Sequence, residues 1–253
     1  MRVLIDRKGL QASWHLEDNL RLCVFLTELL RASYAIAFSP EQTFTAEELN
    51  EYDVLIITTR PRTKDYTEAE IESILAFVGK GGGLLLMANH ADLPNGKRKD
   101  LRKCDAKLAS RFGATLERTF FENSRQGKLT RISGSDLNDK HPIIAGMPGK
   151  ELVELVVTNT CCSIASGKGA RLISLPEEMT NRRDHRPPKE QWFACALDGG
   201  CGLDPESNGR VVVIADSGFI GTDCTTRPGR GLIGHGDNQL FISNVIRWLG
   251  GEL

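Results

Sequence analysis

Between residues 52 and 92, the pattern of apolar and polar positions predicts a strand, a helix and a second strand. Both strand segments, 54–58 and 84–87, are apolar at nearly every position, which is typical of strands covered on both faces. Between them, apolar residues recur at helical spacing from 71 to 78, and three glycines then end the helix. Such a unit joins two parallel strands and therefore predicts an α/β fold.

Several side chains mark the starts of predicted helices. Thr45 precedes a short helical stretch and has Glu48 three residues later, which is the pattern of a capping box. Thr67 has Glu70 at the same spacing, and Asp237 precedes the last helix. The other elements predicted around the parallel sheet are strands at 3–5, 34–38 and 210–215, a helix at 16–30 capped by Ser13, and a helix at 101–112.

Residues 114–208 follow a different pattern. Short strand-like runs alternate there with turn signals, and a long helical period is missing. We expect an antiparallel or mixed β-rich insertion, or an extension of the main sheet. Because no linker interrupts the chain, residues 1–253 are expected to form a single α/β domain that contains this section.

Composition and charge restrict the class of protein. The chain has 32 Lys and Arg against 33 Asp and Glu, so it lacks the overall positive charge that nucleic acid or an anionic membrane would attract. Neither a signal-peptide core nor a run of about 20 apolar residues is present. The seven cysteines include no CxxC pair, which favours reduced thiols. We therefore expect a cytoplasmic protein that binds neither nucleic acid nor membrane; the sequence leaves self-association open.

The order of the segments resembles a known superfamily. The segments that carry the resemblance are VLID at 3–6, YDVLIITT at 52–59, TEAEIESILAFVGKGGGLLLMANH at 67–90, HPIIAGM at 141–147, GRVVVIADSGFI at 209–220 and DNQLFISNVIRWL at 237–249. In this order they resemble the class I glutamine amidotransferase-like superfamily. Within it they are most similar to the non-catalytic branch of DUF4350 and gliding-motility-associated domains, with the trehalose-utilisation-like proteins nearby. The resemblance implies a flavodoxin-like three-layer sandwich with a mostly parallel central sheet.

The resemblance also has a negative implication. Catalytic members carry a cysteine at a tight strand-to-helix elbow, whereas Met87-Ala88-Asn89-His90 follows the corresponding strand here. No G-x-C-x-G or G-x-S-x-G motif occurs, and Cys104, the nearest thiol, has no obvious base beside it. We therefore do not expect glutamine hydrolysis, and whether the chain is an enzyme at all stays open.

Polar residues follow several of the predicted parallel strands. The carboxyl ends of parallel strands meet at one edge of a sheet, where α/β proteins bind ligands. We therefore predict that this edge binds a small polar ligand or a protein partner. The glycine-rich segment 227–238 contributes Arg230 and His235 if it reaches the same edge, although it also fits a plain loop. The predicted ligand-binding residues are Asp6, Arg60, Asn89, His90, Asp92, Asp216, Ser217, Arg230 and His235.

A second hypothesis is an enzyme. His90 with Asp92 and His235 with Asp237 share one spacing, and together they would form a divalent metal site if the fold brought them together. The alternative function is then a metal-assisted or His/Asp-dependent hydrolase of a carbohydrate-like or other small substrate. Apart from this metal, no cofactor is predicted; a purely structural subunit is a third hypothesis. The catalytic residues of the hydrolase would be Asp6, His90, Asp216 and His235.

Overall fold

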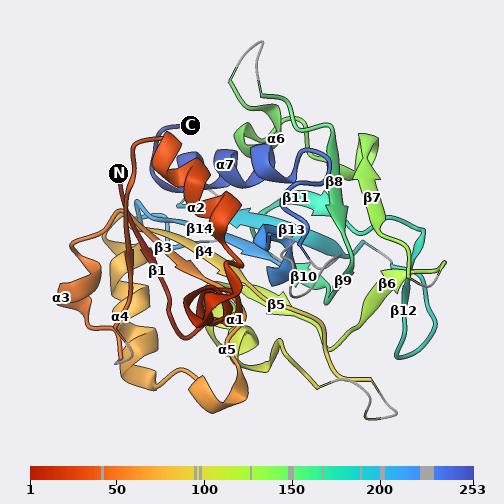
Figure 1. Ribbon diagram of the computed structural model, residues 1–253, viewed down its shortest axis with the longest axis horizontal. Helices are drawn as coiled ribbons and strands as arrows, with labels where there is room; N and C mark the ends of the chain where they lie inside the picture. The colour runs from red at the N-terminus through yellow and green to blue at the C-terminus, as the bar shows by residue number, and fades with distance from the viewer. Residues whose placement is uncertain are drawn as a thin grey trace.

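A large sheet lies between two layers of helices in the computed structural model of the chain (Figure 1). Five strands of this sheet run parallel in the order β2-β1-β3-β4-β14, so the carboxyl ends of β1, β3, β4 and β14 lie along one edge. The strand predicted at 210–215 is confirmed, because β14 pairs in parallel with β4. These strands are β1 (Arg2–Ile5), β2 (Ala35–Phe38), β3 (Val54–Ile57), β4 (Gly83–Met87) and β14 (Arg210–Ile214). The structure describes residues 1–40, 43–93, 96, 99–125, 127–147, 151–166, 168–188, 190–199, 203–222 and 231–253.

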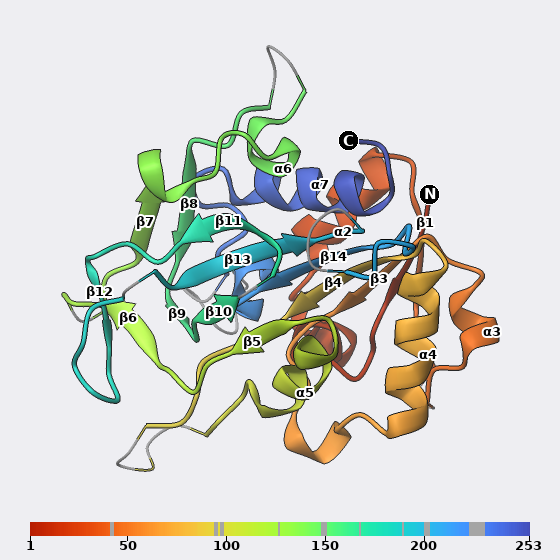
Figure 2. The same cartoon turned by 180° about the vertical axis from the view of Figure 1, so that it is seen from behind.

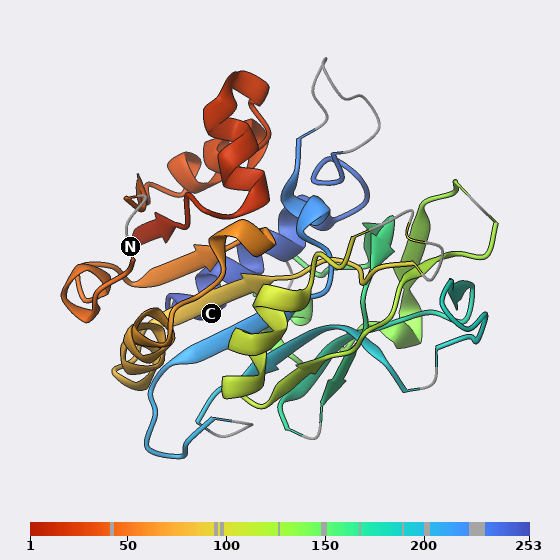
Figure 3. The same ribbon diagram turned by 90° about the horizontal axis from the view of Figure 1, so that it is seen from below.

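The helices cover both faces of the sheet. Helices α2 and α7 contact each other over one face, while α4 and α5 lie over the other (Figure 3). None of the helices in the described part of the chain is long and apolar enough to cross a membrane. The helices are α1 (Leu10–Trp14), α2 (Cys23–Arg31), α3 (Ala46–Leu49), α4 (Glu68–Gly79), α5 (Lys103–Arg111), α6 (Pro142–Ala145) and α7 (Asn238–Leu249). Shorter turns are the π-helix η1 (His15–Asn19) and the 3₁₀ helices η2 (Arg62–Lys64), η3 (Gly134–Asp136) and η4 (Ser217–Ile220).

The prediction of one helix over 16–30 is wrong. Leu20 adopts a left-handed backbone conformation with φ of 45°, and this residue separates η1 from α2. Ser13 lies inside α1, whose N-cap is Gly9, so Ser13 does not cap a helix. The buried residues of α2 are Phe25 and Leu29, whereas Leu20 is exposed. Periodicity alone missed the break because apolar residues continue through it.

The β-rich middle section extends the main sheet with antiparallel strands. Strand β13 pairs antiparallel with β14, and β11 and β10 both pair with β13 (Figure 2). These additional strands are β5 (Ala114–Leu116), β10 (Ile164–Ser166), β11 (Ala170–Ser174) and β13 (Trp192–Leu197). Two small sheets adjoin them, formed by β6 (Phe121–Asn123), β9 (Thr160–Cys161) and β12 (Met179–Asn181), and by β7 (Thr130–Ser133) and β8 (Leu155–Thr158). The fold is thus flavodoxin-like α/β, with a mostly parallel central sheet and an antiparallel extension.

Thr45 and Thr67 cap their helices as predicted, whereas Asp237 does not. Thr45 and Glu48 form both hydrogen bonds of a capping box at α3, as predicted. At α4, Thr67 accepts a hydrogen bond from the backbone N–H of Glu70, but the Glu70 side chain turns into the protein interior. Asp237 occupies the N-cap position of α7 without a side-chain hydrogen bond to that helix, so its predicted capping contact is wrong.

Candidate functional site

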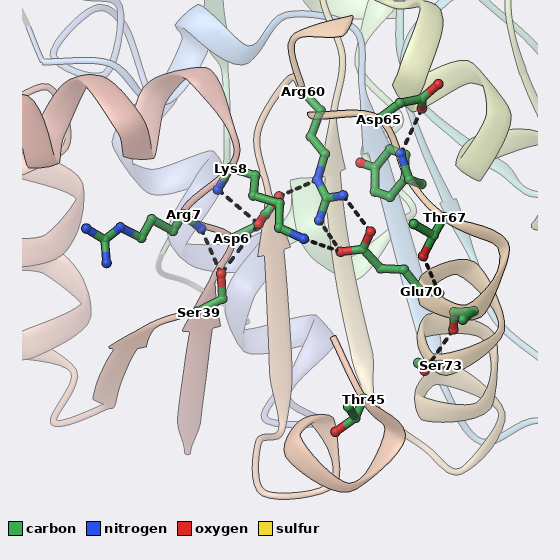
Figure 4. Close-up of polar contacts among 12 residues, drawn as sticks. Asp6, Arg7, Lys8, Ser39, Thr45, Arg60, Asp65, Thr67, Glu70 and Ser73 are labelled. Atoms are coloured by element: carbon green, nitrogen blue, oxygen red, sulfur yellow. Dashed lines mark hydrogen bonds and ion pairs between the residues drawn. The ribbon is translucent and has the colours of Figure 1, made fainter. Parts of the chain in front are cut away.

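Strands β1 and β3 bring Asp6 and Arg60 together, as the sequence predicted for this edge of the sheet. The two strands pair in parallel, so the residues that follow their last positions are neighbours. Arg60 is fully buried, and its Nε donates to Asp6 Oδ2 at 2.7 Å. Its two terminal nitrogens donate to the two carboxylate oxygens of Glu70, at 2.8 and 3.0 Å (Figure 4). This bidentate arrangement is the geometry in which arginine binds a carboxylate most strongly.

Lys8 completes a buried ion network with these three residues. Its Nζ donates to Glu70 Oε1 at 2.9 Å, and the Lys8 and Arg60 side chains both point toward Glu70 (Figure 4). Two cations thus face two carboxylates. Burial alone would raise the pKa of Glu70, but the hydrogen bonds and charges of Arg60 and Lys8 outweigh it and lower that pKa. The Glu70 carboxylate is therefore held charged, and it is fully occupied by protein donors.

Aromatic and acidic groups surround the Arg60 guanidinium. Its central carbon lies 4.0 Å from the ring centroid of Tyr66 and 5.4 Å from that of Phe44, which are distances of cation–π contact. Asp105 Oδ1 accepts hydrogen bonds from the Arg60 backbone N–H at 3.3 Å and from the Tyr66 hydroxyl at 3.1 Å. Burial raises the pKa of Asp105 well above its ordinary value. This carboxyl group therefore favours its neutral form.

A second group of predicted residues follows β4 and β14. The Asn89 amide donates to Ser217 Oγ at 3.3 Å, so these two predicted residues do meet. The carboxylate of Asp216 is buried and accepts hydrogen bonds from Thr158 Oγ1 at 2.9 Å and from the Gly218 backbone at 2.8 Å. Burial raises the pKa of Asp216 to about 6. Its two oxygens are thus engaged by the protein, as those of Glu70 are.

The predicted histidine and aspartate pairs lie in different surroundings. His90 is buried, its Nδ1 is 2.8 Å from the carbonyl oxygen of Ala91, and its ring centroid is 4.4 Å from that of Phe120. His235 is exposed in the turn before α7. Asp237 accepts hydrogen bonds from two backbone N–H groups at the start of β8.

These positions do not make a metal site. In the part of the chain that the structure describes, no three His, Cys, Asp or Glu side chains form a group that could hold a metal ion. Neither the metal set nor the catalytic set of the hydrolase hypothesis is therefore brought together as a chelating cluster. Arg230 lies outside the described residues. The metal set is His90, Asp92, His235 and Asp237, and the catalytic set is Asp6, His90, Asp216 and His235.

Cys104 is not an activated thiol. It is buried on α5, and burial together with the nearby carboxylates of Asp65 and Asp105 raises its pKa to about 12. Nucleophilic catalysis needs the thiolate, which a raised pKa disfavours. This finding agrees with the missing strand-to-helix elbow.

A pocket of about 880 Å³ opens beside the carboxyl ends of β3 and β4, and one of the predicted ligand-binding residues, Asp92, lines it. Asp92 lies in its wall, where it forms ion pairs with Arg118 at 2.8 Å and Arg183 at 2.7 Å. The cations of the pocket were not predicted; their signal in the sequence is the density of basic residues from 97 to 103, which an ordinary solvated loop also shows. We call it the basic pocket; its lining residues are Pro61, Arg62, Thr63, Asp92, Lys99, Asp100, Leu101, Arg102, Lys103 and Arg118.

Solved structures share this fold over the whole chain. No protein-family model and no curated protein matches the sequence. The N-terminal domain of mmIFT52 aligns with a TM-score of 0.68 and 15% identity over 98% of this chain and 97% of that domain. A cytoplasmic protein from Salmonella typhimurium gives a TM-score of 0.56 and 14% identity over 98% of both chains. A ThuA-like protein from Bacteroides uniformis gives 0.52 and 13% over 98% of this chain and 91% of that one.

At these identities the structural likeness establishes the fold and not an activity. The fold is that of ThuA-like proteins. Membership of the class I glutamine amidotransferase-like superfamily stays a prediction. The finer resemblance to the DUF4350 and gliding-motility-associated branch stays a prediction.

Proposed function

We propose that this chain is a non-catalytic, amidotransferase-like binding domain. Its ligand is a small polar molecule, or a segment of a protein partner, that docks at the carboxyl ends of the parallel strands. The observation that carries this proposal is that the buried charged groups at that edge hydrogen-bond to one another. Arg60, Asp6 and Glu70 bind one another in a buried network, so they are engaged in holding loops together and not presented to a substrate.

The pocket at the same edge supports binding. Its volume of about 880 Å³ lies within the range of roughly 300–1,000 Å³ that small-molecule sites occupy. It lies where open α/β sheets place their ligands, outside the carboxyl ends of the strands. Because a small molecule fits this volume, we favour a small ligand over a protein segment.

The hydrolase alternative has less support. His90, one of its two candidate bases, is buried against Phe120, and both oxygens of Asp216 already accept hydrogen bonds. A general base must reach the proton that it removes, which these surroundings hinder. We also propose a reducing, cytoplasmic environment, because the described cysteines form no disulfide; these are Cys23, Cys104, Cys161, Cys162 and Cys195.

Native mass spectrometry of the untagged protein, with a denatured control, tests the proposal. We expect a bound mass of small-molecule size that denaturation releases. Hydrogen exchange with and without that molecule then locates it, and we expect protection at residues 62–63 and 99–103. Protection instead at the opposite end of the strands, around Lys80 and Arg210, would contradict binding at the carboxyl edge. Turnover of chromogenic esters or glycosides that His90→Ala abolishes would favour the hydrolase.

A further inference from the structure

The basic pocket carries more positive charge than its own acids neutralise. Five Lys and Arg side chains line it against two aspartates. Both aspartates are already ion-paired: Asp92 pairs with Arg118 and Arg183, and Asp100 pairs with Arg102. The three remaining cations, Arg62, Lys99 and Lys103, have no ion pair with any residue that the structure describes. A chain of net charge −1 thus concentrates unneutralised positive charge in one hollow.

Two further observations point to an anion in this hollow. Helix α5 begins at Lys103 in the pocket wall, and its N-cap residue, Arg102, makes no side-chain capping hydrogen bond. Asp100 Oδ1 accepts from the Arg102 backbone N–H at 3.2 Å, before the first helical residue. The first N–H groups of a helix and its dipole favour a bound anion. In addition, Arg102 Nε is buried and has no hydrogen-bond partner among the described residues, although this side chain is only 13% exposed. A buried N–H without a partner is unfavourable. Because Arg102 is part of the pocket wall, the charge of an anion in the pocket would offset part of that cost.

We propose that the basic pocket binds a small molecule through a phosphate ester group. This inference rests on the proposed function and adds the chemical class of its ligand. A phosphate monoester carries a charge of about −1.5 to −2 and three strong acceptor oxygens. These properties match several separated donors better than a single carboxylate does, because each oxygen can accept from a different side chain. The stems of the basic residues, with Pro61 and Leu101, offer an apolar surface to the rest of the ligand.

Titration calorimetry of the full chain with phenyl phosphate tests the assignment. Arg62→Glu and Lys103→Glu reverse exposed charges in the pocket and leave the buried core untouched. We expect each variant to weaken binding by about tenfold or more, which corresponds to about 1.4 kcal/mol. Arg131→Glu on β7 is the matched control, since Arg131 is exposed and lies outside the pocket. This control should bind phenyl phosphate as the unmodified protein does.

Several results would overturn the assignment. One is the absence of binding at millimolar phenyl phosphate, and another is an equal loss of affinity in Arg131→Glu, which would indicate unspecific attraction. If succinate binds and phenyl phosphate does not, and Arg62→Glu abolishes succinate binding, the ligand class is wrong while the proposed binding function stands. If the molecule retained in native mass spectrometry protects a different surface, the proposed function fails independently of the phosphate titration.

Discussion

At the scale of single residues, the buried Arg60 network is sensitive to the loss of any one partner. A buried arginine is tolerated only when its charge and its N–H groups are matched. Here Asp6 and Glu70 together accept from Nε and from both terminal nitrogens. Because the guanidinium is fully buried, solvent cannot replace a partner that is removed.

Glu70→Gln should therefore strongly destabilise the protein. The substitution removes one of two negative charges that face Arg60 and Lys8, and it leaves an excess of buried positive charge. Breaking a buried ion pair in this way typically costs about 3–5 kcal/mol in the free energy of unfolding. Urea denaturation followed by circular dichroism measures this difference.

The matched control for that experiment is Glu72→Gln, two residues further along α4, where the side chain is exposed. Glu72 pairs with Arg111 at 2.6 Å, but its side chain is 63% exposed. Exposed pairs contribute about 0–1 kcal/mol, so this variant should unfold close to the unmodified protein. Equal losses in the two variants would show that burial of the Arg60 network does not matter.

Asp216 gives a pH dependence with a defined sign. Its pKa is about 6 in the folded protein, raised by burial from an ordinary value of 3.8. The unfolded chain therefore releases this proton at lower pH than the folded one, and stability from this group falls as pH rises from 3.8 to about 6. Well above pH 6 this contribution is lost completely. The pKa shift corresponds to about 3 kcal/mol in the free energy of unfolding.

Asp216→Asn should remove that dependence. We expect the variant to gain about 3 kcal/mol relative to the unmodified protein between pH 4 and pH 7, as measured by urea unfolding at each pH. The comparison between the two proteins cancels the titration of the other carboxylates. A difference that stays constant with pH would mean that burial does not perturb Asp216.

At the scale of elements, the sequence predicted helix caps whose two partners lie within the same helical turn. The capping box of Thr45 and Glu48 formed because both partners lie within one helical turn. The same motif at Thr67 was only half satisfied, since Glu70 binds Arg60 on a different strand end, and no local pattern reveals that partner. The break at Leu20 was missed because apolar residues continue through it, so periodicity does not reveal its left-handed backbone conformation.

The candidate site divides in the same way. The meeting of Asp6 and Arg60 followed from parallel strands, whose ends are neighbours in any such sheet. The cations of the basic pocket were missed because they come from loops and a helix start, such as Arg62 and Lys103, that carry no periodic signal. The metal hypothesis rested on spacing in the sequence, and spacing does not determine whether His90 and His235 approach each other.

Glycines at the junctions of elements provide a prediction at this scale. A Cβ added to Gly209, just before β14, would lie 1.9 Å from the carbonyl oxygen of Val78 in α4. Gly209→Ala must therefore separate the end of α4 from the sheet, and we expect a loss of about 1–3 kcal/mol in the free energy of unfolding, measured in urea.

Gly79 is the matched control. A Cβ on Gly79, at the end of α4, meets nothing within 4 Å. Gly79→Ala should instead stabilise by about 0.4–1 kcal/mol. Equal effects at the two glycines would contradict this close approach.

At the scale of the whole molecule, the antiparallel extension and the parallel sheet share one core. Strand β13 pairs along its length with β14, which in turn pairs with β4. One cluster of buried apolar side chains contains Leu85 of β4, Phe193 of β13 and Phe241 of α7. Removing the extension would therefore expose the edge of β14 together with apolar surface on both faces.

This continuity predicts that residues 1–253 unfold as a single cooperative unit. The three tryptophans report on different regions: Trp14 on α1, Trp192 on β13 and Trp248 on α7. We therefore compare three variants that each keep one tryptophan and have phenylalanine at the other two positions. Within each variant, fluorescence and circular dichroism should give the same urea midpoint. Coincident transitions by different probes are the test of two-state unfolding. If the Trp192 signal changes at lower urea than the circular dichroism of the same variant, the β-rich section unfolds separately and is a subdomain. Coincident transitions in all three variants would instead mean that β13 and β4 unfold together. The antiparallel extension and the parallel sheet would then belong to one cooperative core.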